Sequence, residues 1–105
     1  MGRKAILAAL AVLCLWPAAL LMAQDDIRRH PACQFCGMDR AKFAHSRFFI
    51  AYEDGSTQGT CSIHCAAIEF ALQIDKTPKT MEVGDYGTKV LVDAEKAFWV
   101  LGGNK

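Results

Sequence analysis

Two close pairs of cysteines constrain this chain more than any other feature. Cys33 and Cys36 stand in a C-x-x-C-G segment, and Cys61 and Cys65 follow further along. Four thiolates can hold one soft metal ion only if the fold brings both pairs to the same place. The segments around the pairs are therefore expected to form elements that bring them together.

The residues between the two pairs have the pattern of a β-hairpin. Residues 47–52 are mostly aromatic or β-branched, and residues 53–56 contain Asp-Gly. A short second strand at residues 57–60 leads directly to the second pair. Gly37, after the first pair, can adopt a positive φ at low cost, which suits a tight turn at residues 33–38. We call this turn the knuckle.

The second pair lies where a helix is predicted to begin. Ser62 is a suitable N-cap, and the helix is expected to end near residues 73–75. The positive end of the helix dipole would lower the pKa of nearby thiols and favour thiolate ligands. The predicted apolar face of this helix consists of Ile63, Ala66, Ala67, Phe70, Ala71 and Ile74.

Short strands are expected after the helix. Residues 80–83 and 88–92 have strand composition, joined by a turn at residues 84–87. A single helical turn at residues 94–97 precedes a last predicted strand at residues 98–101. The aromatic residues expected in the core are Phe48, Phe49, Phe70, Phe98 and Trp99. The whole pattern predicts a small, treble-clef-like α+β domain: knuckle, β-hairpin, helix, then short strands.

The N-terminal residues have the pattern of an export signal. Arg3 and Lys4 precede an uncharged apolar run, residues 5–23, which ends in a small residue. This run of 19 residues could also cross a hydrocarbon core of about 30 Å as an uncleaved anchor. Cys14 has a bulky residue before it and is not expected to be lipidated.

These features divide the chain into three parts. We expect a signal peptide or N-terminal anchor at residues 1–23, a linker without regular structure at residues 24–32, and a metal-binding domain at residues 33–105. The domain is expected to be periplasmic or otherwise extracytoplasmic. It would contact the membrane only through residues 5–23, if that segment stays attached.

Composition and motifs argue against several functions. Without the first 23 residues, ten basic residues face eleven acidic ones, so a basic surface for nucleic acid is not expected. The chain has no evident Ser-His-Asp arrangement, phosphate-binding glycine loop or paired-carboxylate pocket, and we do not expect an enzyme. Asp54 and Asp93 are better explained as turn and cap residues. A domain of about 80 residues commonly needs a metal or disulfides to supplement its small core.

A metal site is the preferred interpretation of Cys33, Cys36, Cys61 and Cys65. Four thiolates suit tetrahedral Zn²⁺ and also suit soft Cu(I), and the thioether of Met38 would add a preference for Cu(I). Structural disulfides or a thiol–disulfide redox site are the alternatives, because exported cysteines oxidise readily. Redox C-x-x-C motifs usually open a helix within a βαβ frame, whereas here the motif precedes a hairpin. The histidines are weaker candidate ligands: His30, His45 and His64.

Four segments of the chain resemble the NosL family. They are residues 33–39 (CQFCGMD), 52–56 (YEDGS), 60–62 (TCS) and 92–102 (VDAEKAFWVLG). NosL proteins are exported accessory proteins of nitrous oxide reductase maturation, regarded as Cu(I) chaperones of the bacterial cell envelope.

The resemblance implies Cu(I) as the cargo, with Zn²⁺ as the alternative metal. It also implies an apo-cuproenzyme such as nitrous oxide reductase as partner. Cys33, Cys36, Met38 and Cys61 fall on positions that the family shares. Cys65 departs from the family pattern, and with it the cysteine layout is similar to that of TRASH-type heavy-metal domains.

Overall fold

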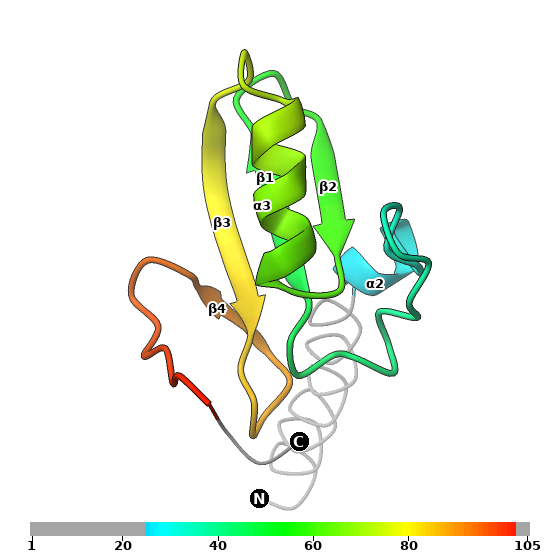
Figure 1. Ribbon diagram of the computed structural model, residues 1–105, viewed down its shortest axis with the longest axis vertical. Coiled ribbons are helices and arrows are strands. Elements are labelled where there is room, and N and C mark those ends of the chain that lie inside the picture. Colours follow the sequence, from blue (N-terminus) through cyan, green and yellow to red (C-terminus); the bar gives the residue numbers. More distant parts are fainter. Residues whose placement is uncertain (1–24, 103–105) are drawn as a thin grey trace, which may run out of the picture.

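A four-stranded antiparallel sheet with a helix across one face makes up the fold (Figure 1). The computed structural model describes residues 25–102. The sheet has the order β2-β1-β3-β4. Its strands are β1 (Phe48–Tyr52), β2 (Thr57–Thr60), β3 (Pro78–Gly84) and β4 (Leu91–Asp93). The main helix is α3 (Ile63–Leu72), and a short helix α2 (Asp25–Arg29) precedes the knuckle. The predicted α+β class is confirmed, with knuckle, hairpin, helix and later strands in the predicted order.

The predicted hairpin is confirmed. In its register Phe48 pairs with Thr60, and Ala51 pairs with Thr57. The turn is held by Asp54, whose Oδ1 accepts hydrogen bonds from the amide and hydroxyl groups of Ser56 at 2.8 and 2.6 Å. Because Thr60 directly precedes Cys61, the register of the hairpin fixes where the second cysteine pair begins.

Strand β1 supplies the centre of the core. Phe48, Ile50 and Tyr52 alternate along it and are buried beneath α3. Phe48 pairs with Val83 and Ile50 with Met81 on β3, so these side chains share one face of the sheet. The cluster is completed by Ala66 and Ala94, with Phe70 and Ala97 packed against it.

The predicted apolar face of α3 is only partly correct. Ala66 is buried and Phe70 packs on the core, as expected. Ile63, Ala67, Ala71 and Ile74 are exposed instead, Ile74 to 88%.

Helix α3 is rotated about its axis relative to the prediction, and the residues that face the sheet show why. Cys65, Ala66 and Glu69 are the buried residues of α3. Cys65 has to reach the other cysteines, and this turns Glu69, one helical turn later, into the interior. There Oε1 of Glu69 accepts a hydrogen bond of 2.9 Å from the hydroxyl of Tyr52, which leaves Oε2 buried without a hydrogen-bond partner among the described residues.

The C-terminal part departs further from the prediction. Strand β4 is shorter and begins later than residues 88–92, because Lys89 adopts a left-handed φ of 61° in the preceding turn. The turn at residues 94–97 forms as expected, since the amide of Ala97 donates to the carbonyl of Asp93. The strand predicted at residues 98–101 is absent from the described sheet, and Phe98 is 101% exposed. The aromatic and β-branched residues of this segment favour a strand, but a strand also needs a neighbouring strand to pair with, and composition does not provide one.

The N-terminal linker prediction is wrong for residues 25–29, which form α2. Asp26 on this helix is 5% exposed, and its Oδ2 lies 2.8 Å both from Nη2 of Arg40 and from Nε of Arg47. Both arginines are fully buried. Of the charged residues in this helix, Asp26 is therefore buried in the domain, whereas Asp25, Arg28 and Arg29 stay at the surface.

Residues 1–23, predicted as a signal peptide or anchor, lie outside the described residues, as does Cys14. In residues 25–102, no helix is both long and apolar enough to cross a membrane.

We predict that Asp26→Ala lowers the free energy of unfolding by about 3–5 kcal/mol, because it leaves two buried guanidinium groups without this carboxylate. Asp25→Ala is the matched control on the same helix. Its ion pairs with Arg28 and Arg29 are solvent-exposed, so it should cost at most about 0.5–1 kcal/mol. Urea denaturation of both variants measures the difference, and equal losses would show that the buried network does not stabilise the fold.

Candidate metal centre

The fold brings the four predicted cysteines to one place. The Sγ atoms of Cys33, Cys36, Cys61 and Cys65 all lie within 4.8 Å of one another, and all four are free thiols. The Cys36–Cys61 sulfur distance is 3.3 Å, and the Cys61–Cys65 distance is 3.7 Å. Sulfurs held at about 2.3 Å around a tetrahedral ion lie roughly 3.8 Å apart. The cluster therefore has the dimensions of a four-thiolate metal site.

The first pair is held by the knuckle. The amide of Cys33 donates to the carbonyl of Met38 at 2.9 Å, and the amide of Gly37 donates to the carbonyl of Cys33 at 2.8 Å. Gly37 has a φ of +76°, where an L side chain would be strained. An isolated bridge between Ala32 and Asp39 closes the base of the turn. The predicted turn is thus confirmed, and its backbone hydrogen bonds fix the positions of Cys33 and Gly37 within it.

The second pair is positioned by the end of β2 and the start of α3. The hydroxyl of Ser46 donates to the carbonyl of Cys61 at 2.9 Å and fixes the chain there. Ser62 occupies the predicted N-cap position with extended backbone, but its side chain makes no capping hydrogen bond. Cys65 follows in the first turn of the helix, which places its sulfur beside that of Cys61.

The thiols differ in how readily they ionise. Burial opposes ionisation of Cys33, but backbone N–H groups of Cys36, Phe35 and Cys61 outweigh it and lower the pKa of Cys33 to about 6. Burial raises the pKa of Cys61, and the Cys36 thiol adds to this increase. Burial also raises the pKa of Cys65, together with the thiols of Cys61, Cys33 and Cys36. The helix N-terminus is expected to lower the pKa of these two thiols, but the structure does not show this, because the loss of solvation on burial has the larger effect.

Arg40 makes hydrogen bonds to the backbone of the segments that lead to the cysteines. Its guanidinium donates to the carbonyl of Thr60 at 3.0 Å, of His30 at 2.7 Å and of Phe48 at 3.1 Å. These carbonyls belong to the chain before each cysteine pair and to the central strand. A Cβ at Gly59 would lie 2.5 Å from the guanidinium carbon, so the close approach of β2 requires glycine. Sequence reasoning missed this network, since no spacing rule links Arg40 to its partners.

The four sulfurs are unequally accessible. Cys33, Cys61 and Cys65 are buried, whereas Cys36 is exposed at the outer edge of the knuckle. Met38, two residues after Cys36 in the chain, is 47% exposed, and its backbone carbonyl helps to close the turn. A role for its thioether as a ligand stays a prediction.

The three histidines lie outside the sulfur cluster. His30 is hydrogen-bonded to the hydroxyl of Thr57 at 3.0 Å, and the ring of His45 meets that of Tyr86 edge-on. His64 is exposed on α3.

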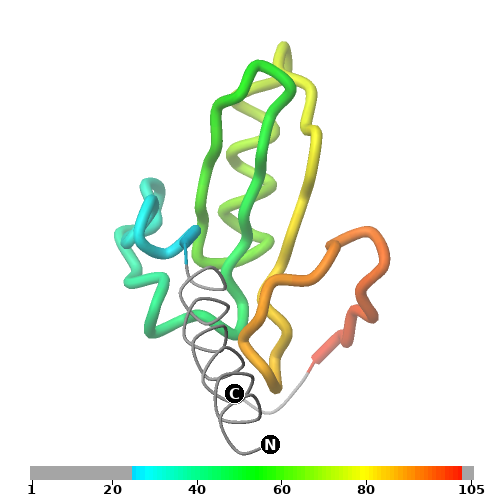
Figure 2. Tube along the Cα trace, turned by 180° about the vertical axis from the view of Figure 1, so that it is seen from behind, coloured from blue at the N-terminus to red at the C-terminus, as the bar shows by residue number. Residues whose placement is uncertain are grey.

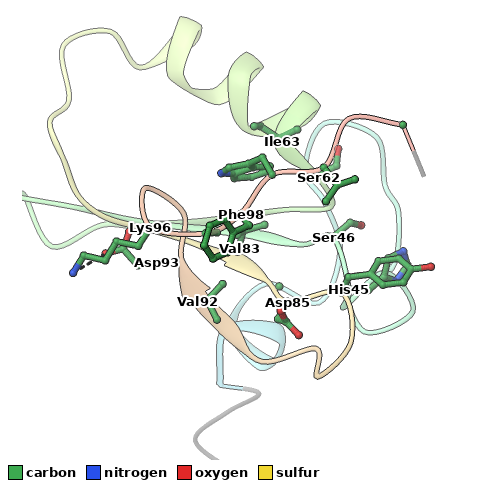
Figure 3. Close-up of a pocket in the computed structure, with 16 residues that line it drawn as sticks. His45, Ser46, Ser62, Ile63, Val83, Asp85, Val92, Asp93, Lys96 and Phe98 are labelled. Carbon is green, nitrogen blue, oxygen red and sulfur yellow. Dashed lines mark ion pairs between the residues drawn. The ribbon is translucent and has the colours of Figure 1, made fainter. Parts of the chain in front are cut away.

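A large groove lies apart from the sulfurs (Figure 3). It has a volume of about 1050 Å³ and runs between the start of α3, the β3–β4 region and the C-terminal segment. None of the four cysteines lines it, and most of its lining is apolar, including Ile63, Val83, Val92, Phe98 and Trp99.

Comparison of the chain with protein-family models, with curated proteins and with solved structures found no match. The resemblance to the NosL family therefore stays a prediction from the four segments quoted above.

We predict that the reduced, metal-free protein shows one thiol ionising near pH 6, because backbone N–H groups stabilise the Cys33 thiolate at a pKa of about 6. Thiolate ultraviolet absorbance followed against pH measures this step. Cys33→Ser should remove it, and Cys65→Ser should leave it in place. A low-pH step that survives in Cys33→Ser would contradict the assignment.

Proposed function

We propose that this protein binds one soft metal ion at its four sulfurs and carries it, as Cu(I), to another protein outside the cytoplasm. The observation that supports this most directly is the cluster of four thiols within 4.8 Å, of which three are buried and one is exposed. Buried thiols retain a metal, and an exposed one gives another protein access to it.

The chemistry of the donor set supports Cu(I) as cargo. Thiolates and thioethers are soft ligands that select Cu(I), and Met38, 47% exposed, belongs to the same knuckle as the exposed Cys36. The lowered pKa of Cys33 supplies one thiolate at neutral pH, so binding begins without the full cost of deprotonation.

The exposed edge of the knuckle is where the metal would be exchanged. A thiolate of a partner can approach Cys36, whereas burial shields Cys33, Cys61 and Cys65. Metal transfer by ligand replacement would therefore start at Cys36. The apolar N-terminal run supports export, and the NosL resemblance supports an apo-cuproenzyme such as nitrous oxide reductase as recipient.

A structural Zn²⁺ module that binds a protein partner is the second candidate. One observation favours it: the sulfurs come from the knuckle, the end of β2 and the first turn of α3, so a bound ion would join three separate segments. Structural zinc stabilises small domains in this way.

Competition between the two metals distinguishes these functions. We expect the zinc-loaded protein, titrated anaerobically with Cu(I), to release its zinc and retain one equivalent of copper, because the thiolates are soft ligands. Elemental analysis after gel filtration measures both metals, and protein with alkylated thiols is the control for adventitious binding. Zinc that stays bound in the presence of excess Cu(I) would favour the structural module.

Single substitutions separate the exposed sulfur from a buried one. Cys36→Ala should lower Cu(I) affinity by more than about 100-fold and change the stability of the metal-free protein by no more than about 0.5 kcal/mol. Cys65→Ala should lower affinity and also destabilise the metal-free fold by about 1–2 kcal/mol, because it opens a gap in a buried cluster.

The measurements are competition with a Cu(I) chelator and urea denaturation. Met38→Leu, which keeps the size of the side chain, tests the thioether in the same assays. Unchanged Cu(I) affinity in Cys36→Ala would rule out the four-sulfur site.

A further inference from the structure

Ser62 occupies the N-cap position of α3 but does not cap the helix with its side chain. Its backbone is extended, with a φ of −163° and a ψ of 172°, as the backbone of an N-cap residue usually is. The hydroxyl of such a serine normally accepts a hydrogen bond from an amide of the first helical turn. Here the side chain makes no capping hydrogen bond, so its hydroxyl is available for another partner.

That partner is the sulfur of Cys61. In the metal-free protein the Cys61 thiol donates a hydrogen bond to Oγ of Ser62, with 3.7 Å between the two atoms. A thiol is a weak donor, so this hydrogen bond contributes little to the stability of the metal-free fold. The hydroxyl of Ser62 can donate as well as accept, and this matters once a metal is bound.

Metal binding reverses the direction of this hydrogen bond. A cysteine loses its proton when it becomes a metal ligand, and the resulting thiolate can only accept. Rotation of the O–H bond of Ser62 is then sufficient for the hydroxyl to donate to the Cys61 thiolate. A hydrogen bond to an ionised acceptor is roughly twice as strong as one between neutral groups. The contact between Ser62 and Cys61 therefore stabilises the metal-bound state more than the metal-free state.

Cys61 has few other groups that can stabilise a negative charge on its sulfur. The residue is 5% exposed, and its sulfur lies 3.3 Å from that of Cys36 and 3.7 Å from that of Cys65. Its own amide N–H donates to the sulfur of Cys33. In the described part of the chain, the hydroxyl of Ser62 is the one oxygen or nitrogen group that is hydrogen-bonded to the Cys61 sulfur.

The backbone of Ser62 is fixed by hydrogen bonds to its carbonyl. The hydroxyl of Thr60 donates to this carbonyl at 3.0 Å, and the amide of Ala66 donates to it at 3.1 Å. Figure 3 shows Ser62 at the start of α3, beside Ile63, where it lines the groove. With its backbone fixed, Ser62 can hold its hydroxyl beside the Cys61 sulfur at a small cost in conformational entropy.

We propose that Ser62 is a positioning residue of the metal centre, whose hydroxyl donates a hydrogen bond to the metal-bound sulfur of Cys61 and so stabilises the bound ion. This inference rests on the proposed function, because it requires a metal at the four sulfurs, but it applies to Cu(I) and Zn²⁺ alike. Loss of a group that hydrogen-bonds to a metal ligand typically lowers metal affinity by about 10–100-fold.

Substitutions in the full chain test this role. Ser62→Ala should lower Cu(I) affinity by about tenfold or more in competition with a Cu(I) chelator, and Ser62→Thr, which keeps a hydroxyl, should restore most of the loss. Ser56→Ala is the matched control, because Ser56 is also half-buried and its hydroxyl donates to Asp54. The turn at residues 53–56 lies at the other end of the hairpin from the start of α3 (Figure 2), so this variant should bind like the wild type.

Two further measurements separate this role from a structural one. The urea midpoint of metal-free Ser62→Ala should equal that of the wild type, whereas the loss of a helix cap would lower it. Co(II) also binds at thiolate sites, and the sulfur-to-cobalt charge-transfer band should move to longer wavelength in Ser62→Ala, because the Cys61 thiolate loses a hydrogen bond. If Ser62→Ala does not fold, Ser62→Gly removes the hydroxyl with little loss at an N-cap position.

The outcomes distinguish the role of Ser62 from the proposed function. Wild-type protein that binds neither Cu(I) nor Co(II) would overturn both. If the wild type binds these metals, equal affinity and an equal charge-transfer band in Ser62→Ala would overturn the role of Ser62 alone. A loss of affinity that Ser62→Thr does not restore, or one that Ser56→Ala shares, would also contradict it.

Discussion

The guanidinium of Arg40 holds this small domain together. It is fully buried and donates to carbonyls before the knuckle, on β1 and at the end of β2, while the Asp26 carboxylate balances its charge. Arg47 shares that carboxylate and reaches the carbonyls of Ala44 and Lys89. A domain of this size has a limited hydrophobic core, so a satisfied polar network carries much of its specificity.

This network matters most for the sulfur site. The carbonyl of Thr60, directly before Cys61, is one of the acceptors of Arg40. The charge of Arg40 is balanced by Asp26. Removal of Asp26 would leave the buried guanidinium without this carboxylate, and this costs far more than the ion pair contributes in net stability. The position of the second cysteine pair is thus coupled to helix α2, far away in sequence.

Placing a cysteine in the first turn of α3 determines the rest of that helix. Cys65 faces the sulfur cluster, so Glu69 follows it into the interior and the aliphatic residues turn outward. Tyr52 satisfies one oxygen of Glu69, and the other stays without a hydrogen-bond partner in the described part of the chain. The sulfur cluster and the uncharged outer face of α3 thus have the same origin, the rotation of one helix.

The sequence by itself determined the hairpin, the knuckle and the four cysteines that come together. Asp-Gly at the turn, alternation in residues 48–52 and the cysteine spacing predicted the hairpin and the knuckle, because these patterns act over a few residues. The tertiary structure decided which helix face is buried, that residues 98–101 stay out of the sheet, and that Asp26 joins Arg40 and Arg47. Those outcomes depend on contacts between segments that are distant in the sequence. Packing and the burial of charges decide these contacts, and a pattern of a few residues cannot predict them.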